Sequence, residues 1–236
     1  MTGSVLLPDK DPLGAMLKDY YNGDKTAYVR VESPVLDMSK MRGKTMFRDE
    51  FSDIEQTALG VCRGRILDVG AGSGCHSLAL QKAGADVTAL DISPGCMAVL
   101  EKRRVEQRIF SSLFSLENQR FTTLLMLMNG IGICGSIEGL NFFFQKIRSL
   151  LSRGGQVVVD STDLSAMYTR QALVPGETDT YYGETQFTMS YGNICGDPFD
   201  WLYIDYATLA FYAQFHGWQC EQVMTTKDKK FLARIF

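Results

Sequence analysis

The chain has 236 residues, 45% of them hydrophobic, and carries a formal net charge of −3 at pH 7. A chain of this length can bury one sizeable core, so we expect a single domain over residues 1–236. The small acidic excess gives no broad attraction for nucleic acid or for an anionic membrane, so neither is an expected partner, and small-molecule or protein substrates are favoured.

Targeting and metal signals are weak. The only apolar run near the start covers residues 5–7, and no window approaches a membrane span, so we expect a cytoplasmic protein without a signal peptide. Neither His76 nor His216 belongs to a helical pair or a cysteine cluster, so no metal site is expected. The cysteines contain no C-x-x-C pair and are expected to be free thiols: Cys62, Cys75, Cys96, Cys134, Cys195 and Cys220.

Residues 1–60 are predicted to form a helical N-terminal cap. Asp11 and the proline after it are typical of a helix start, and the apolar residues that follow favour a helix over 12–21. Residues 26–31 have β character, and a second helix is predicted over 49–59.

Over residues 61–236 the pattern changes to alternating apolar strands and helices. Such alternation is typical of a parallel sheet with right-handed crossovers. The predicted strands are 65–69, 87–91, 108–112, 122–128 and 156–160, and the predicted helices between them are 75–83, 94–104 and 136–151.

The C-terminal part is predicted to complete the sheet. A helix over 205–216 precedes two strands, 219–225 and 230–235, which a short polar turn joins into an antiparallel hairpin. An insertion over about 164–204, after the fifth strand, is expected to be irregular chain with one or two extra strands. The expected fold is therefore an α/β, Rossmann-like, doubly wound, seven-stranded mixed sheet with an antiparallel C-terminal hairpin.

A glycine-rich loop joins the first core strand to the helix that follows it. Gly70, Gly72 and Gly74 alternate in this loop, and Asp91 ends the next strand. Glycines at a strand-to-helix turn let a ligand approach the main chain, and a carboxylate some twenty residues later reaches ribose hydroxyls. The pattern therefore indicates a nucleoside site at the carboxyl ends of the strands.

The loop also indicates which nucleoside is bound. Cys75 stands where a dinucleotide-binding G-x-G-x-x-G pattern has its third glycine, which argues against a nicotinamide or flavin dinucleotide. Asp68, followed by G-x-G-x-G and then by Asp91, resembles the motifs of class I S-adenosylmethionine (SAM) dependent methyltransferases. The resemblance covers roughly residues 65–154 and implies SAM as cofactor, with S-adenosylhomocysteine (SAH) as product.

The resemblance also implies roles for individual residues. Asp68 would help to organise the polar network around the aminoacyl end of the cofactor, and Asp91 would accept hydrogen bonds from both ribose hydroxyls. The alternative interpretation is that these residues form only a tight turn beside a solvated carboxylate at the end of a strand. The predicted cofactor-binding residues are Asp68, Gly70, Ala71, Gly72, Gly74, Asp91, Ile92, Ser112, Leu113 and Asn129.

The expected adenine site departs from the family pattern. Relatives commonly carry an aspartate at the end of the third strand, whereas this chain has Ser112 and Leu113. A hydroxyl and a backbone amide can still bond to adenine, but a neutral hydroxyl should hold it less strongly than a carboxylate. Ile92 is expected either to lie against the adenine ring or to be an ordinary core residue.

Asn129, after the fourth predicted strand, is the best candidate for an active-site residue. In many relatives a polar residue there borders the transferring methyl group, and its amide could orient a substrate oxygen or nitrogen. The alternative is a strand-ending Asn-Gly turn. The Pro-Pro-Tyr that follows such an Asn in some DNA amino methyltransferases is missing, which disfavours DNA base methylation.

Four other charged side chains are weaker candidates. His76 is expected to be a neutral capping or packing residue, because the positive end of a helix dipole disfavours an imidazolium. Arg48 is expected in a solvated surface pair or, as in some relatives, near the cofactor carboxylate. Asp160 and Asp163 are possible bases, although solvated strand-end carboxylates are commoner.

Aromatic residues of the insertion could line a substrate pocket, because aromatic faces attract a sulfonium cation. Tyr181 and Tyr182 are favoured as pocket members, although such residues more often belong to the core.

Three functions therefore stay open on the sequence alone. The favoured one is a methyltransferase that acts on a small molecule by in-line displacement, with positioning and closure as its main contributions. The alternatives are a SAM-binding protein without catalysis and, less favoured, a nicotinamide-dependent oxidoreductase. The sequence indicates neither the acceptor nor the oligomeric state.

Overall fold

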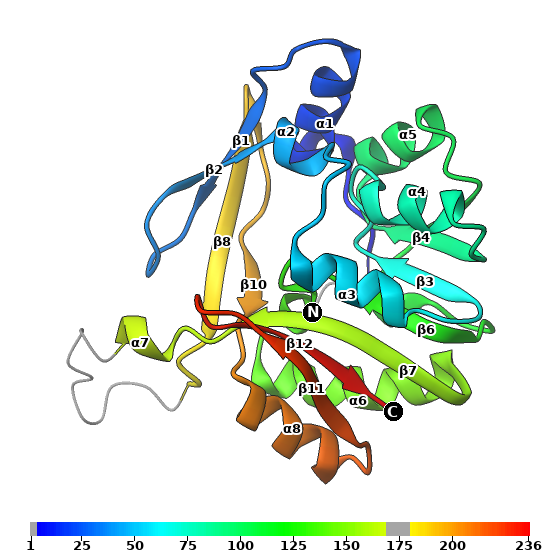
Figure 1. Cartoon of the computed structure of the whole chain (residues 1–236). Coiled ribbons are helices and arrows are strands. Elements are labelled where there is room, and N and C mark those ends of the chain that lie inside the picture. Colours follow the sequence, from blue (N-terminus) through cyan, green and yellow to red (C-terminus); the bar gives the residue numbers. More distant parts are fainter. Residues whose placement is uncertain (1–3, 169–179) are drawn as a thin grey trace.

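The computed structural model describes residues 4–168 and 180–236 and has a seven-stranded mixed sheet at its centre (Figure 1). The strands of this sheet are β3 (Ile66–Val69), β4 (Val87–Asp91), β5 (Gln107–Phe110), β6 (Phe121–Met126), β7 (Leu151–Thr162), β11 (Cys220–Thr225) and β12 (Lys230–Ile235). Their order is β11-β12-β7-β6-β3-β4-β5. The predicted fold class is confirmed.

The five strands from β3 to β7 are parallel, and the C-terminal hairpin closes one edge. β12 pairs antiparallel with β7, and β11 pairs antiparallel with β12. Every residue of β3 and β4 is buried, as expected for parallel strands that are covered on both faces. The strand order reverses between β3 and β6, so a ligand crevice is expected beyond their carboxyl ends.

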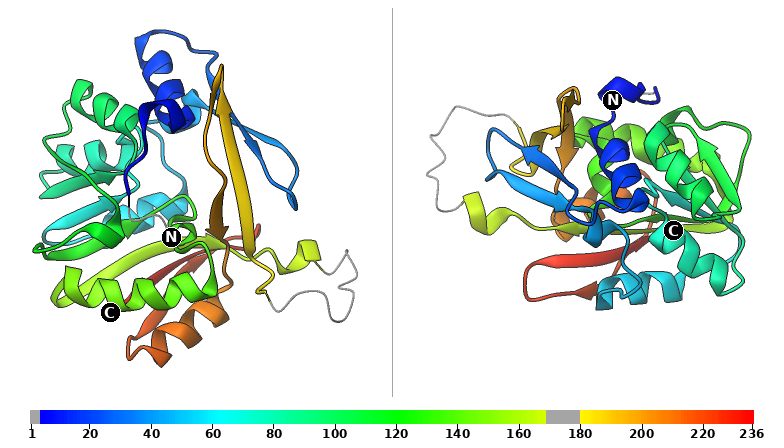
Figure 2. Two further views of the ribbon diagram at one scale, coloured as in Figure 1. Left: turned by 180° about the vertical axis from the view of Figure 1, so that it is seen from behind. Right: turned by 90° about the horizontal axis from the view of Figure 1, so that it is seen from above.

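Helices cover both faces of the sheet (Figures 1 and 2). On one face Ile54 and Leu80 pack with Val158 of β7, and on the other Phe143 and Phe144 belong to the largest apolar cluster. The first face carries α3 (Asp53–Val61), α4 (Cys75–Lys82) and α5 (Pro94–Lys102), and the second carries α6 (Ile137–Leu150) and α8 (Tyr206–Phe215).

Local sequence explains where these helices begin. The Ser52 hydroxyl and the Glu55 carboxylate form a reciprocal capping box at the start of α3. The Ser136 hydroxyl accepts from the backbone N–H of Gly139 in α6, and the Asp205 carboxylate caps α8.

A second, antiparallel sheet combines the N-terminal cap with the insertion. Its strands are β1 (Tyr28–Glu32), β2 (Ser39–Arg42), β8 (Glu184–Tyr191), β9 (Ile194–Cys195) and β10 (Phe199–Leu202). The order is β10-β8-β1-β2, and β9 pairs with β8. The carboxyl ends of the parallel strands point towards this second sheet (Figure 1).

The cap and the insertion contain more strand than the sequence indicates. β2 was not predicted, because this mostly exposed edge strand has no apolar alternation. The insertion contains three strands where one or two are expected, and its residues 169–179 lie outside the described part of the chain. β7 also starts five residues earlier than predicted, with an irregularity where it first pairs with β6.

Helix α1 (Pro12–Asn22) packs the second sheet against α5. Met16 and Leu17 lie in one apolar cluster with Val29 and Val31 of β1 and with residues of α5. The backbone of Gly14 lies so close to Gly95 that a Cβ at Gly95 would overlap it. The short elements are η1 (Pro8–Lys10), α2 (Gly43–Met46), η2 (Leu113–Ser115), η3 (Gly130–Cys134) and α7 (Ser165–Tyr168).

All six cysteines are free, as predicted. In the part of the chain that the structure describes, no helix combines the length and the apolarity needed to cross a membrane.

Candidate functional site

The glycine loop after β3 has a backbone that only glycine adopts easily. The φ angles of Gly70, Gly72 and Gly74 are 71°, 56° and 82°. A Cβ at Gly74 would meet the side chain of Leu100, so this glycine also lets α4 pack on α5. Nothing lies within 4 Å of the place where a Cβ of Gly70 would be, so the loop is open on that side.

Asp91, at the end of β4, ties this loop to the start of α5. Its Oδ2 accepts a hydrogen bond from the backbone N–H of Gly72 at 2.8 Å, and its Oδ1 accepts one from Ser93 at 2.9 Å. Burial, together with the nearby charge of Asp11, raises the pKa of Asp91 to about 6. Each carboxylate oxygen keeps a second lone pair that can accept a ligand hydroxyl.

Asp11 is a site residue that the sequence indicates only as a helix cap. Its Oδ1 accepts from the N–H of Gly14, as expected, but its Oδ2 accepts from the Ser93 hydroxyl at 2.6 Å and from the N–H of Gly95 at 2.9 Å. The side chain is buried and places a second carboxylate beside Asp91. The sequence does not indicate that Asp11 contacts Ser93 and Gly95, which lie more than eighty residues further along the chain.

Asp68 lies inside the molecule, directly under the glycine loop. Its Oδ2 accepts a hydrogen bond from the Ser77 hydroxyl of α4 at 2.5 Å. Burial raises its pKa, although the charge of His76 and the bonds from Ser77 act in the opposite direction.

The environment of His76 raises its pKa, which favours a charged ring over the neutral ring predicted. Its Nε2 lies 2.7 Å from Oε1 of Glu55 on α3. Burial alone would lower the pKa of His76, but the hydrogen bonds to Cys75 and Glu55 and the charge of Asp68 raise it to about 10. The dipole of α4 does not decide the state of this ring, because Glu55, on another helix and 21 residues away in the sequence, places a carboxylate beside it.

Arg48 is the second cation on Glu55. Its guanidinium forms an ion pair with the Glu55 carboxylate and also donates to the backbone carbonyl of Thr45. Although burial opposes ionisation, the hydrogen bonds from His76, Ser52 and Arg48 hold the pKa of Glu55 well below its usual range. Arg48 therefore belongs to a partly buried network that links the cap to α4, and its guanidinium is already engaged.

The expected adenine wall follows β4 and β5. Ser112 is buried, and its hydroxyl oxygen accepts a bond from the N–H of Phe114, so it caps η2. Leu113 is buried beside it, while Ile92 is half-buried. The carbonyl of Ile92 accepts a bond from the N–H of Leu6 at 2.8 Å, so the N-terminal segment crosses this edge of the site.

The loop after β6 holds Asn129 in a strained backbone. Met128 and Asn129 have φ angles of 66° and 57°, in the left-handed region that non-glycine residues rarely adopt. Asp160 of β7 accepts bonds from the backbone N–H groups of residues 128–130, including Gly130 at 3.2 Å. Thr162 donates to Oδ1 of Asn129 at 2.7 Å, so the end of β7 fixes both the backbone and the amide.

Two tyrosines and two aspartates join the insertion to the core. The Tyr181 hydroxyl donates to Asp205 at 2.6 Å, and the Tyr182 hydroxyl lies 2.9 Å from Asp205 and 3.0 Å from Asp163. Burial and the Asp205 carboxylate raise the pKa of Tyr181 to about 12. Although burial opposes ionisation, bonds from Ser165 and Tyr182 lower the pKa of Asp163, which makes it a weak base.

The predicted residues gather along one edge of the sheet, at the carboxyl ends of β3 to β6. Together they offer open main chain, a buried carboxylate with free lone pairs and an apolar wall, which is the chemistry that a nucleoside requires. In the described ranges, no group of three or more His, Cys, Asp or Glu side chains is arranged to hold a metal ion.

Comparisons with known proteins agree on the fold and the motif. A family model described as a methyltransferase domain matches residues 66–155. A SAM-dependent methyltransferase from Bacteroides fragilis, crystallised with S-adenosyl-L-homocysteine, is 43% identical; the match covers 99% of this chain and 97% of that chain, with a TM-score of 0.92.

More distant structures are similar in fold. The CcbJ methyltransferase from Streptomyces caelestis is 15% identical over 96% of this chain and 98% of that chain, with a TM-score of 0.61. The glycopeptide N-methyltransferase MtfA, complexed with SAM, is 16% identical over 78% and 92% of the two chains, with a TM-score of 0.56. No curated protein sequence matches the chain.

Proposed function

Because the chain belongs to the family of SAM-dependent methyltransferases, we propose that it transfers a methyl group from SAM to a small-molecule acceptor by in-line displacement. The observation that carries the proposal is Asp91, a buried carboxylate with free lone pairs beside an open glycine loop. The Bacteroides fragilis relative, which was crystallised with SAH and matches nearly the whole chain, supports the same cofactor here.

The residues along the sheet edge fit such a cofactor. Asp91 would accept bonds from the ribose hydroxyls, and the open main chain at Gly70 would leave room for the methionine portion. Ser112 and Leu113 would border the adenine ring from the end of β5, and Ile92 would cover one of its faces. The Ser112 hydroxyl oxygen already accepts a bond, which supports a weak hold on adenine.

The chemistry comes from the cofactor, and the protein positions and encloses it. When bound, SAM supplies an electrophilic methyl group on a positively charged sulfur, and its transfer to an acceptor lone pair breaks the sulfur–carbon bond and leaves neutral SAH. Asn129, held by Thr162 and by a loop that Asp160 fixes, would orient the acceptor. Such positioning can lower a barrier by several kcal/mol without a covalent intermediate.

Among the described residues, neither carboxylate near the Asn129 loop is free to act as a general base. Burial raises the pKa of Asp160 to about 6, but this side chain is committed to three consecutive backbone amides, and the pKa of Asp163 is lowered although burial opposes it. We therefore propose an acceptor that reacts through an available lone pair and loses any proton to solvent.

The second sheet supports a small acceptor. It stands opposite the carboxyl ends of the parallel strands (Figure 1), and Trp201 of β10 lies against Gly132, three residues after Asn129. Chain from the insertion thus packs beside the Asn129 loop, which favours a small acceptor over a folded partner or a nucleic acid duplex.

Calorimetry and product detection test the proposal. We expect the protein to bind SAM and SAH and not NAD, and to transfer label from methyl-labelled SAM to a compound in a metabolite extract. The Asn129→Ala variant should lose more of its turnover than of its affinity for SAH. Binding of NAD without SAH would overturn the assignment, and SAH binding without any labelled product would support a binding protein without catalysis.

A further inference from the structure

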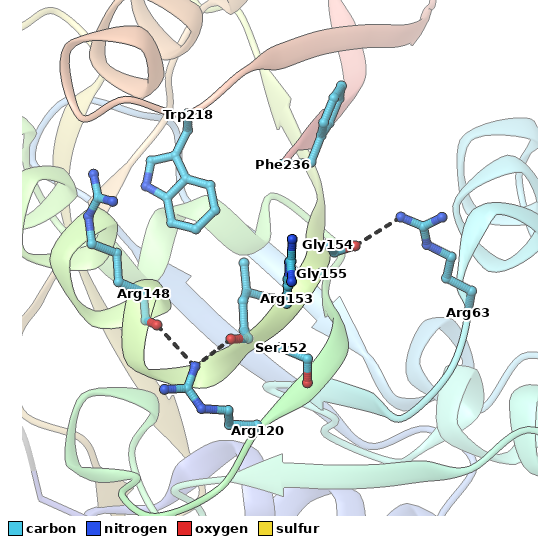
Figure 3. Close-up of a pocket in the computed structure, with 10 residues that line it drawn as sticks. Arg63, Arg120, Arg148, Ser152, Arg153, Gly154, Gly155, Trp218 and Phe236 are labelled. Carbon is cyan, nitrogen blue, oxygen red and sulfur yellow. Dashed lines mark hydrogen bonds between the residues drawn. The ribbon is translucent and has the colours of Figure 1, made fainter.

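A groove lies at the edge of the sheet opposite the candidate active site. It has a volume of about 520 Å³ and is formed around the first residues of β7 (Figure 3). Its lining residues are Arg63, Arg120, Arg148, Leu151, Ser152, Arg153, Gly154, Gly155, Trp218 and Phe236. Four of these ten residues are arginines, and none is an Asp or a Glu, although the whole chain carries a net charge of −3.

Three of the four arginines are held in place by backbone carbonyl groups. Arg63 donates to the carbonyl of Gly154 at 3.1 Å, Arg120 donates to that of Leu151 at 2.7 Å, and Arg148 donates to that of His216 (Figure 3 draws the first two). In the described part of the chain none of them forms an ion pair. A guanidinium has five N–H donors, so each keeps several donors for a ligand.

One side of the groove is aromatic and is formed by Trp218. The Arg148 guanidinium stacks over the Trp218 ring, with its carbon 5.3 Å from the ring centre. The Trp218 Nε1 is buried and has no hydrogen-bond partner among the described residues. Since a guanidinium can only donate, the arginines give the groove donors, and the Trp218 ring gives it an aromatic surface.

The geometry points to a binding site for a nucleoside phosphate in this groove. Guanidinium groups pair with phosphate oxygens through two parallel N–H donors. Four guanidiniums without an ion-pair partner among the described residues favour a ligand with more than one negative charge. Trp218, Leu151 and Phe236 give the same groove apolar and aromatic surface against which a base can pack. The volume lies in the range of small-ligand sites.

The site is separate from the proposed SAM site. The groove contacts residues 151–155 at the start of β7, whereas Asp160 and Thr162 near its end face the Asn129 loop. At about 3.3 Å per strand residue, Gly155 and Asp160 are about 17 Å apart along the strand. A ligand in the groove therefore leaves the carboxyl edge of the sheet free.

Titration calorimetry with GDP and with inorganic pyrophosphate tests this inference. The protein is first saturated with SAH, so that no nucleotide can enter the site at the carboxyl edge. We expect GDP to bind with a dissociation constant below about 1 mM and pyrophosphate to bind more weakly, because it lacks the base. Added salt should weaken both.

Arginine variants assign the binding to the groove. Arg63→Gln combined with Arg153→Gln should weaken GDP binding at least about tenfold while SAH affinity and the unfolding midpoint stay unchanged. Arg42→Gln, on the exposed edge strand β2, is the matched control and should leave GDP binding as it is. Undetectable GDP binding, equal binding by the double variant, or binding of single-stranded RNA without binding of GDP would each overturn the inference.

Discussion

Two buried carboxylates at the candidate site, Asp91 and Asp160, are held by backbone N–H groups and not by cationic side chains. Neither forms an ion pair in the described part of the chain, and burial raises the pKa of each to about 6. Both are therefore mostly ionised at neutral pH. An ionised acceptor in a dry site binds a hydroxyl more strongly than a solvated one does.

The role of Asp91 predicts a loss of cofactor affinity on substitution. Asp91→Ala should weaken SAH binding by about 1–3 kcal/mol, because the ribose would lose charge-assisted hydrogen bonds. Calorimetry with SAH measures the effect. Asp86→Ala, an exposed carboxylate just before the same strand, is the matched control. Unchanged affinity in Asp91→Ala would place the ribose elsewhere.

The charge of His76 predicts a pH-dependent contribution to stability. The pKa of His76 in the folded protein, about 10, lies above the value of about 6.5 expected in the unfolded chain. Its stabilising effect is therefore complete below pH 6.5 and is lost as the pH rises towards 10. Denaturant unfolding of the wild type and of His76→Gln should give a difference in unfolding free energy that shrinks over this range. A constant difference would mean that the ring is neutral.

At the scale of elements, the end of β7 fixes the loop that follows β6. Asp160 and Thr162 project from the same face of β7, and they hold the backbone and the side chain of the Asn129 loop respectively. Two consecutive non-glycine residues with positive φ can persist there because these bonds offset the local strain. A neighbouring strand thus sets the geometry of the candidate active-site residue.

Removing the Asp160 acceptor should release this loop. Asp160→Ala leaves buried backbone N–H groups without a partner, which costs about 1–3 kcal/mol, and we expect turnover to fall further than SAH affinity does. Asp160→Asn keeps one acceptor oxygen and should recover part of the lost stability and part of the lost turnover. Denaturant unfolding measures the stability, and steady-state kinetics measures the turnover. Wild-type stability and turnover in Asp160→Ala would contradict the role given to Asp160.

The sequence predicts the parallel core well because its signals are local. Buried strands read as apolar runs, but the helix predicted over 49–59 begins only at Asp53, where Ser52 and Glu55 form a capping box. The glycine loop and Asp91 can also be identified from a local sequence pattern. The partners of Asn129 and His76 are not, because Thr162 and Glu55 come from other elements and only the folded chain brings them close. Pairing between the cap and the insertion was hidden for the same reason.

At the scale of the whole molecule, α1 joins the second sheet to the core. One of its faces packs under β1, and its start lies against α5 through the close approach of Gly14 to Gly95. Asp11 binds both ends of this contact, since it accepts from Gly14 and from Gly95. The cap and the Asp91 region are therefore mechanically connected.

A side chain at Gly95 should separate α1 from α5. Gly95→Ala would force its methyl group into the backbone of Gly14, and such overpacking typically costs about 1–3 kcal/mol; SAH affinity should fall as well because Ser93 and Asp91 shift. Gly60→Ala is the matched control, since nothing lies near its Cβ position in α3 and alanine favours a helix. Denaturant unfolding and calorimetry measure both variants. Equal unfolding free energies and equal SAH affinities of the two variants would show that α1 and α5 are not tightly packed at Gly95.

The pairing of β1 with β8 unites segments about 160 residues apart into one structural unit. Val29 and Val31 of β1 pack in one apolar cluster with Phe187 and Met189 of β8. Exchange of either segment alone with that of a relative would mismatch these side chains, so a chimaera that keeps the second sheet intact must carry both segments.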